Sequence, residues 1–193
     1  MSFCQQCTSN GGKYGYGTVF SITTAGTEKV LHSFGTGSDG RAPIDGLIEL
    51  KGNLYGTTRA GGAHTCGSGR GQYAGCGTVF SITPEGAEKV LHSFNSTDGA
   101  NPAAALIDAG GTFYGTTAHG GANGDGTVFS ITLGGREKVL RSFTGYPNDG
   151  AAPMAPLIDL GAVRCTVRLP TAVRRWDRLR AEGVAALARR KLC

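Results

Sequence analysis

Cysteines are the residues of this chain best suited to redox or metal chemistry, and six of them lie among its 193 residues. Cys66 and Cys76 flank a glycine-rich insertion. A disulfide between them would close that loop and stabilise the fold by roughly 2–3 kcal/mol on the chain-entropy model. We predict this disulfide, which suits an oxidising compartment. The alternative is a pair of free thiols in a glycine-rich loop.

Cys4 and Cys7 form a Cys-x-x-Cys motif near the N-terminus. A redox motif of this kind needs a βαβ context, and a zinc site needs a second pair of ligands at suitable spacing. Neither is evident in the sequence, so we interpret the motif as incidental. Cys165 and Cys193 lie in an atypical C-terminal segment and indicate little.

Four histidines could serve in metal binding or acid–base catalysis. His32 and His92 occupy equivalent positions of a repeated motif, and the third copy of that motif has Arg141 there. A position that accepts arginine indicates a solvated or inter-blade polar site rather than a metal ligand. His64 and His119 are predicted to lie in loops, without acidic residues nearby in the sequence.

Acidic residues followed by glycine recur along the chain, as Asp39-Gly40, Asp98-Gly99 and Asp149-Gly150. Calcium binding is one interpretation, but the segments lack the ligand spacing of an EF-hand loop. Asp-Gly is a common tight-turn pair because both residues tolerate positive φ. We predict turns at all of these positions. We expect no catalytic residue, no cofactor and no metal site in the chain.

The elements that carry these residues are repeats. GTVFSIT stands at 17–23, 77–83 and 126–132, and each copy is followed by EKVLHSF or EKVLRSF. The underlying period is about 50 residues, with one loop insertion before the second GTVFSIT. Internal repetition at such a period is typical of solenoids, propellers and other repeat arrays.

Each repeat contains segments rich in β-branched and aromatic residues between Gly, Asp and Asn clusters, which is a strand signal. Four strands are expected per repeat: GTVFSIT, EKVLHSF, an apolar run (44–50, 103–107 and 154–160) and NLYGTT or TFYGTT (53–58 and 112–117). Alternation along the second of these predicts that Val30, His32 and Phe34 share one face. No segment before residue 160 has a convincing helical period.

Four strands in 40–50 residues is the spacing of a propeller blade. We therefore predict an all-β fold, a partial β-propeller of about three four-stranded blades over residues 8–160. A β-solenoid is the alternative, although its coils usually repeat at a shorter period. An immunoglobulin-like sandwich would not require such close internal identity.

The motifs LYGTT, GG, GTVFSIT, EKVLHSF, DG, P and LI recur together in this order, and such units resemble the GloVer (Gloeo/Verruco) tandem repeat. The resemblance covers roughly Thr8 to Leu160. It implies a secreted or surface-displayed bacterial repeat protein, a propeller of unassigned activity. It transfers no catalytic residue.

The N-terminal residues 1–7 open in mid-repeat, so that Cys7 stands where the other copies have threonine. MSFCQQC has neither the basic start nor the apolar stretch of a signal peptide. No run is long and apolar enough to span a membrane. A chain made as given is therefore expected in the cytoplasm, whereas the family resemblance implies an extracellular or cell-surface parent.

The C-terminal segment 161–193 departs from the repeat. It carries nine Lys and Arg against two acidic residues, so the basic character of the whole chain, net charge +5, resides there. Possible codons for Gly161–Arg174, read in a shifted frame, give GGTLYGTTAYGGA, close to GGTFYGTTAHGGA at 110–122. We predict that this tail is a frameshifted continuation of the array. Residues 171–191 could form an amphipathic basic helix, but on this interpretation it binds neither nucleic acid nor membrane.

Three functional interpretations follow. The leading one is a non-enzymatic repeat protein that binds a surface ligand or glycan through its loops and self-associates through open sheet edges. The first alternative is a fragment of a carbohydrate-active propeller enzyme, which would need two carboxyls about 5–9 Å apart. The acidic residues are mostly turn or strand-edge copies, such as Glu28, Glu88 and Glu137. The second alternative is a truncated gene product without function.

Overall fold

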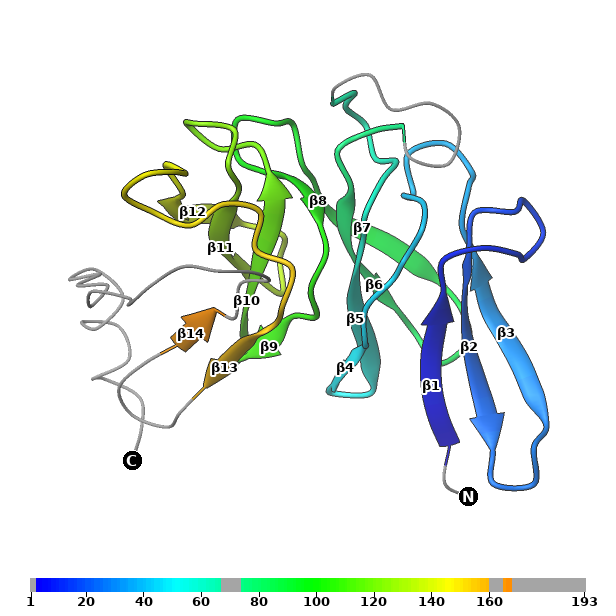
Figure 1. Cartoon of the computed structure of the whole chain (residues 1–193). Helices are drawn as coiled ribbons and strands as arrows, with labels where there is room; N and C mark the ends of the chain where they lie inside the picture. Colours follow the sequence, from blue (N-terminus) through cyan, green and yellow to red (C-terminus); the bar gives the residue numbers. More distant parts are fainter. Residues whose placement is uncertain (1–2, 67–73, 160–164, 168–193) are drawn as a thin grey trace.

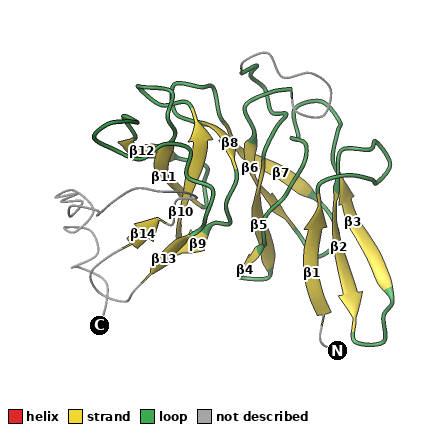
Figure 2. Cartoon of the chain, viewed as in Figure 1, coloured by secondary structure: helices red, strands yellow, loops and turns green. Residues whose placement is uncertain are grey.

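The computed structural model describes residues 3–66, 74–159 and 165–167, with the backbone alone described at residues 3, 4 and 165–167. These residues form fourteen β-strands and no helix (Figures 1 and 2). The all-β class is therefore confirmed. The described strands form no closed barrel or ring, so the propeller arrangement stays a prediction. The basic tail, apart from the backbone of residues 165–167, lies outside the described residues, as does the interpretation placed on it.

Three antiparallel sheets contain most of the strands. The first sheet has the order β1 (Phe3–Thr8), β2 (Thr18–Thr23), β3 (Glu28–Ser33). The second sheet has the order β4 (Ile48–Leu50), β5 (Asn53–Thr58), β6 (Thr78–Ile82), β7 (Glu88–Ser93). Each sheet thus ends on the EKVLHSF motif.

The third sheet repeats this plan with one addition. Its order is β12 (Glu137–Ser142), β11 (Thr127–Thr132), β10 (Thr112–His119), β8 (Ala100–Pro102), and β9 (Ile107–Asp108) also pairs with β10. A separate pair consists of β13 (Leu157–Asp159) and β14 (Cys165–Val167). In Figure 1 the three sheets stand side by side along the chain.

The apolar run was expected to form a strand over 44–50, and the strand is shorter: only Ile48–Leu50 pairs with β5. Ala42 has a φ of +53°, and Pro43 has no N–H to donate to a sheet. These two residues keep the start of the run in a loop. The corresponding run in the third sheet, 103–107, contributes only β9, at Ile107–Asp108.

Two apolar clusters join the sheets. The cluster between the first and second sheets contains Val19, Phe34, Leu54, Phe80 and Ile82. The cluster between the second and third sheets is larger and includes Phe94, Phe113, Phe129 and Ile131. The same edge-to-face ring contact occurs in both, at 5.0 Å for Phe34–Phe80 and 5.1 Å for Phe94–Phe129. Burying a Phe side chain contributes about 1.5–3 kcal/mol, so these clusters hold the sheets together.

Close packing of the Asp-Gly loop of one sheet against a threonine pair of the next also joins the sheets. The hydroxyls of Thr58 and Thr78 lie 2.8 Å apart. Gly40 (φ +101°) lies so close that a Cβ there would stand 2.8 Å from the Thr78 hydroxyl. Gly99 approaches Thr127 in the same way, with 2.9 Å left for a Cβ. Both glycines are needed for the close approach as well as for the positive φ.

Candidate functional site

A β-bulge decides where the motif histidine points. In the second sheet, Val79 pairs with His92 while Phe80 pairs with Val90, so Leu91 is the extra residue. Directly paired residues share a face of the sheet. His92 therefore lies on the Val79 face, which packs on the third sheet, and Val90 lies on the opposite face.

The same bulge corrects the expected alternation in the first sheet. Val19 pairs with His32 and Phe20 pairs with Val30, so Val30 and His32 lie on opposite faces. His32 and Phe34 do share a face, with their rings 4.7 Å apart. The prediction that Val30 lies with them was wrong, because a bulge shifts the period-2 pattern by one residue.

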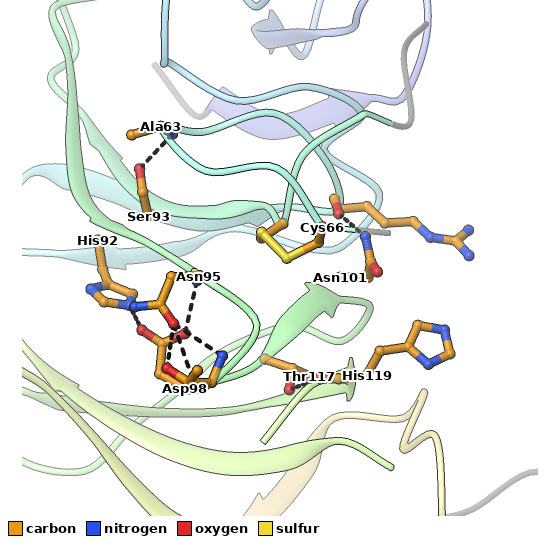
Figure 3. Close-up of a disulfide and its surroundings, with 12 residues drawn as sticks. Ala63, Cys66, His92, Ser93, Asn95, Asp98, Asn101, Thr117 and His119 are labelled. Atoms are coloured by element: carbon orange, nitrogen blue, oxygen red, sulfur yellow. Dashed lines mark hydrogen bonds and ion pairs between the residues drawn. A yellow bond between two sulfur atoms is a disulfide. The ribbon is translucent and has the colours of Figure 1, made fainter. Parts of the chain in front are cut away.

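The aspartate of the Asp-Gly loop holds this histidine (Figure 3). His92 Nε2 lies 3.0 Å from Asp98 Oδ2, and the backbone N–H of Asn95 donates to Asp98 Oδ1 at 2.9 Å. Burial acts to raise the pKa of Asp98, but the hydrogen bonds from His92 and Asn95 outweigh it and lower the pKa. The carboxylate thus stays ionised while it fixes the loop that follows β7.

Glu137 reaches this pair from the neighbouring sheet. It pairs with Ile131, whose side chain belongs to the cluster between the second and third sheets. Its Oε1 is buried and has no hydrogen-bond partner among the described residues. Burial raises the pKa of Glu137 to about 7, with His92 opposing the rise and Asp98 adding to it. One ligand atom from each of His92, Asp98 and Glu137 lies within 4.8 Å of the others.

The first and second sheets meet in a similar arrangement. His32 Nε2 lies 3.2 Å from Asp39 Oδ2, and Glu88 extends from the second sheet with its Oε1 buried and without a partner among the described residues. Burial raises the pKa of Glu88 to about 7. The pKa of Asp39 is lowered: burial opposes this, but hydrogen bonds from His32, Gly35 and Thr36 prevail.

The third repeat keeps the carboxylate and exchanges the cation. Arg141 donates to Asp149 Oδ2 at 2.7 Å, and the backbone N–H of Thr144 donates to the same oxygen at 3.2 Å. These bonds lower the pKa of Asp149 against the effect of burial. Gly150, the remaining turn position singled out in the sequence, donates its N–H to Asp149 Oδ1.

Cys66 and Cys76 are joined by a disulfide, with their Cα atoms 4.9 Å apart. Cys76 is fully buried and belongs to the cluster between the second and third sheets, and Cys66 packs against that cluster. The bond therefore ties the base of the inserted loop to the core (Figure 3). Residues 67–73 of the loop lie outside the described part of the chain.

Among the side chains that the structure describes, the other cysteines and histidines are not brought together. Cys7 occupies the position of Thr57, as both pair with the valine of GTVFSIT. Its thiol donates to the Asp45 carbonyl at 2.8 Å, and burial raises the pKa of Cys7 to about 11. The side chains of Cys4, Cys165 and Cys193 lie outside the description. His64 is exposed in a loop. His119 was also predicted to lie in a loop, but it is the exposed last residue of β10 and pairs with Ala100.

A family model, the Gloeobacter/Verrucomicrobia repeat, matches residues 6–163. The chain belongs to this repeat family. The expected resemblance is thus confirmed, and the match covers all three His–Asp or Arg–Asp pairs. No curated protein and no solved structure matches the chain. In the described part of this Gloeobacter/Verrucomicrobia repeat protein, no helix has the length and hydropathy that spanning a bilayer requires.

Sequence reasoning missed the two glutamates of these clusters. Glu88 and Glu137 looked like strand-edge residues, and the motif EKVLH does place a glutamate four residues before each histidine. The glutamate that meets His92, however, comes from the next repeat and not from the same motif. Only the stacking of one sheet on the next brings them together. An imidazole, an ionised carboxylate and a second carboxyl in this arrangement can hold a proton or a cation.

Proposed function

We propose that this chain is a part of a β-propeller, in which the three sheets are blades, and that it acts as a non-enzymatic scaffold outside the cell. The supporting observation is the exchange of His92 for Arg141 between successive repeats, with the ion pair to aspartate retained. A side chain that took part in a reaction would not be replaced by one that cannot exchange protons near neutral pH. The pair therefore serves the fold, and the scaffold interpretation follows.

Binding is assigned to the end of the sheets where the longer loops gather. Antiparallel pairing places the β1–β2 connection and the connection after β12 at the same end of their sheets. Tyr14 in the first connection is 40% exposed, and Tyr146 in the second is 95% exposed. Exposed aromatic rings of this kind suit stacking on a glycan surface. Tyr55, by contrast, is buried against Phe113 and is a packing residue.

The test is affinity electrophoresis through gels that contain soluble polysaccharides. We expect the wild-type chain to be retarded by at least one of them and Tyr146→Ala to lose that retardation. Ile158→Ala is the matched control, since Ile158 is 49% exposed but lies within strand β13, outside these connections. Retardation that survives both Tyr14→Ala and Tyr146→Ala would remove the loop end from the proposal.

The disulfide supports an exported protein, because such bonds persist in oxidising compartments. Expression of the parental gene as a fusion to a reporter that functions only outside the cytoplasm tests this placement. Reporter activity is expected, and its absence from the intact parental product would contradict export.

The partner proposed for the uncovered face of the first sheet is a sheet of the same repeat from another copy of the chain. Phe20 and Ile22 are only half-buried there, whereas their equivalents Phe80 and Ile82 are fully buried against the neighbouring sheet. Val30 extends this face of the first sheet. We expect concentration-dependent self-association in light scattering behind a sizing column. A monomer at every concentration would contradict it.

One observation favours a carbohydrate-active enzyme as the second candidate. Asp98 and Glu137 lie close together, and their pKa values are moved in opposite directions. Such a split is the pattern of a glycosidase acid and its partner carboxylate. The arrangement recurs at Asp39 and Glu88, however, as a repeated structural feature would. Release of reducing ends from polysaccharides is therefore expected to be absent. If the chain did cleave a polysaccharide and Glu137→Gln abolished that cleavage, the enzyme would become the favoured function over the scaffold.

A further inference from the structure

We propose that His92, Asp98 and Glu137 form a binding site for a divalent transition metal of the zinc type. The metal would connect the second and third sheets, since His92 belongs to β7, Asp98 to the loop after it and Glu137 to β12. This site goes beyond the scaffold function, which does not require a metal.

The geometry brings three ligand atoms of suitable kinds to one point. One atom of each residue lies within 4.8 Å of the other two, and this is the group of three that gathers so closely among the described residues. Tetrahedral zinc holds nitrogen and oxygen ligands at about 2.0–2.2 Å, which places neighbouring ligand atoms about 3.3 Å apart. His92 Nε2 and Asp98 Oδ2 already lie 3.0 Å apart. The flexible Glu137 side chain would supply the remaining movement.

A separate observation concerns the Glu137 side chain itself. Its Oε1 is buried at the junction and accepts no hydrogen bond from a described residue. Buried carboxylate oxygens are normally satisfied, so an orphan oxygen facing a His–Asp pair calls for a partner. A cation would satisfy this oxygen, and Asp98 and His92 would donate lone pairs to the same cation.

The donor set selects the class of metal. Calcium and magnesium take oxygen ligands, whereas an imidazole nitrogen suits zinc and its neighbours in the first transition row. Two carboxylates and a neutral imidazole balance a doubly charged ion, with one position left for water. The backbone N–H of Asn95 holds Asp98 Oδ1, which orients the carboxylate as an outer hydrogen bond does in metal sites.

The chain carries its own comparison positions for a test. Arg141 replaces the histidine in the third repeat and still binds its aspartate, at 2.7 Å. His92→Arg should therefore keep the pair with Asp98 and the fold, while it removes the imidazole ligand. Glu137→Gln changes the third ligand with almost no change of volume. His119→Arg alters an exposed histidine at the end of β10, outside the cluster, and is the matched control.

The experiment is a calorimetric titration of the full chain with zinc chloride after chelator treatment, without reductant. Cys4, Cys7, Cys165 and Cys193 are replaced by serine throughout, because thiolates bind zinc. We expect about one zinc per chain and an upward shift of the melting temperature. Calcium chloride should give neither. His92→Arg and Glu137→Gln should each weaken binding at least about tenfold, and His119→Arg should leave it unchanged.

The proposal is overturned if zinc up to millimolar concentration neither binds nor shifts the melting temperature. It is equally overturned if binding survives both Glu137→Gln and His92→Arg. Should His92→Arg fail to fold, Glu137→Gln alone decides the matter. Because the titration measures metal and not glycan, its failure would leave the proposed scaffold function in place.

Discussion

The second and third repeats hold the same carboxylate in the same place with different cations. His92 lies 3.0 Å from Asp98 and Arg141 lies 2.7 Å from Asp149, and each carboxylate also accepts a backbone N–H from its own loop. The histidine is 20% exposed, whereas the arginine is 46% exposed. The aspartate is therefore the part that the fold requires. The cation can vary, and only the imidazole can exchange a proton or ligate a metal near neutral pH.

A second difference lies in the loops between β5 and β6 and between β10 and β11. Gly61 bridges to Gly75 in the longer loop, and Gly120 bridges to Asp125 in the shorter one. The two loops therefore begin and end in the same way, with a backbone bridge between their ends. The insertion is accommodated between fixed ends, and the Cys66–Cys76 disulfide closes it there. An added loop in a repeat protein can therefore be tolerated where a cross-link limits its freedom.

Opening this disulfide is expected to have the largest effect. Cys66→Ser should lower the free energy of unfolding by roughly 3 kcal/mol, since the closed loop of about ten residues gains freedom in the unfolded chain. Cys66 is the better choice because Cys76 is fully buried and its replacement would also disturb the core. Denaturant unfolding measures the loss. Reduction of the wild-type chain should reproduce it, and equal midpoints with and without reductant would show that no disulfide is present.

Removal of the aspartate tests the first difference. Asp98→Ala should cost about 2 kcal/mol, because the backbone N–H of Asn95 and the largely buried His92 both lose a charged partner. Asp149→Ala should cost about 1 kcal/mol or less, since solvent reaches its arginine partner and screens the pair. Chemical denaturation of both variants gives the comparison. Equal losses would mean that exposure of the cation does not matter to the pair.

The sequence predicted the repeats and the all-β class because strand signals and turn residues act locally. GTVFSIT and EKVLHSF both form strands, and the Asp-Gly positions lie in the loops that follow. The bulge at Leu91 could not be predicted from alternation, since it interrupts the period without a glycine or proline to mark it. The meeting of Glu137 with His92 depends on the packing of separate sheets, which no spacing within one motif specifies.

The pH dependence of stability tests the role of Glu137, which lies where the second and third sheets meet. The pKa of Glu137 is raised in the folded chain from 4.5 to about 7. The folded chain thus holds this proton more tightly than the unfolded chain. Its contribution to stability is present below pH 4.5 and is lost as the pH rises through about 7. After allowance for solvent screening, the loss should be about 1 kcal/mol.

Glu137→Gln should reduce this pH dependence, when melting is followed in the presence of a chelator. The part due to Glu88, whose pKa is also raised to about 7, should remain. Glu28→Gln is the matched control, because Glu28 has the same place in its motif but is exposed. The control should retain the wild-type pH profile. A Glu137→Gln profile parallel to that of the wild type would assign the slope to another group.

Exchanging the cations between the two repeats should have the smallest effect. In His92→Arg, the edge contact between His92 and Phe94, with ring centroids 4.9 Å apart, is lost. An aromatic contact of this kind contributes about 0.5–1.5 kcal/mol. A permanent ion pair to Asp98 offsets about 0.2–1 kcal/mol of that.

Arg141→His makes the opposite exchange at a more exposed pair and should change the free energy of unfolding by about 0.5 kcal/mol or less. Thermal melts at pH 7 measure both. If His92→Arg instead costs as much as Asp98→Ala, the two cations are not equivalent to the fold, and the imidazole is held there for packing that arginine cannot supply.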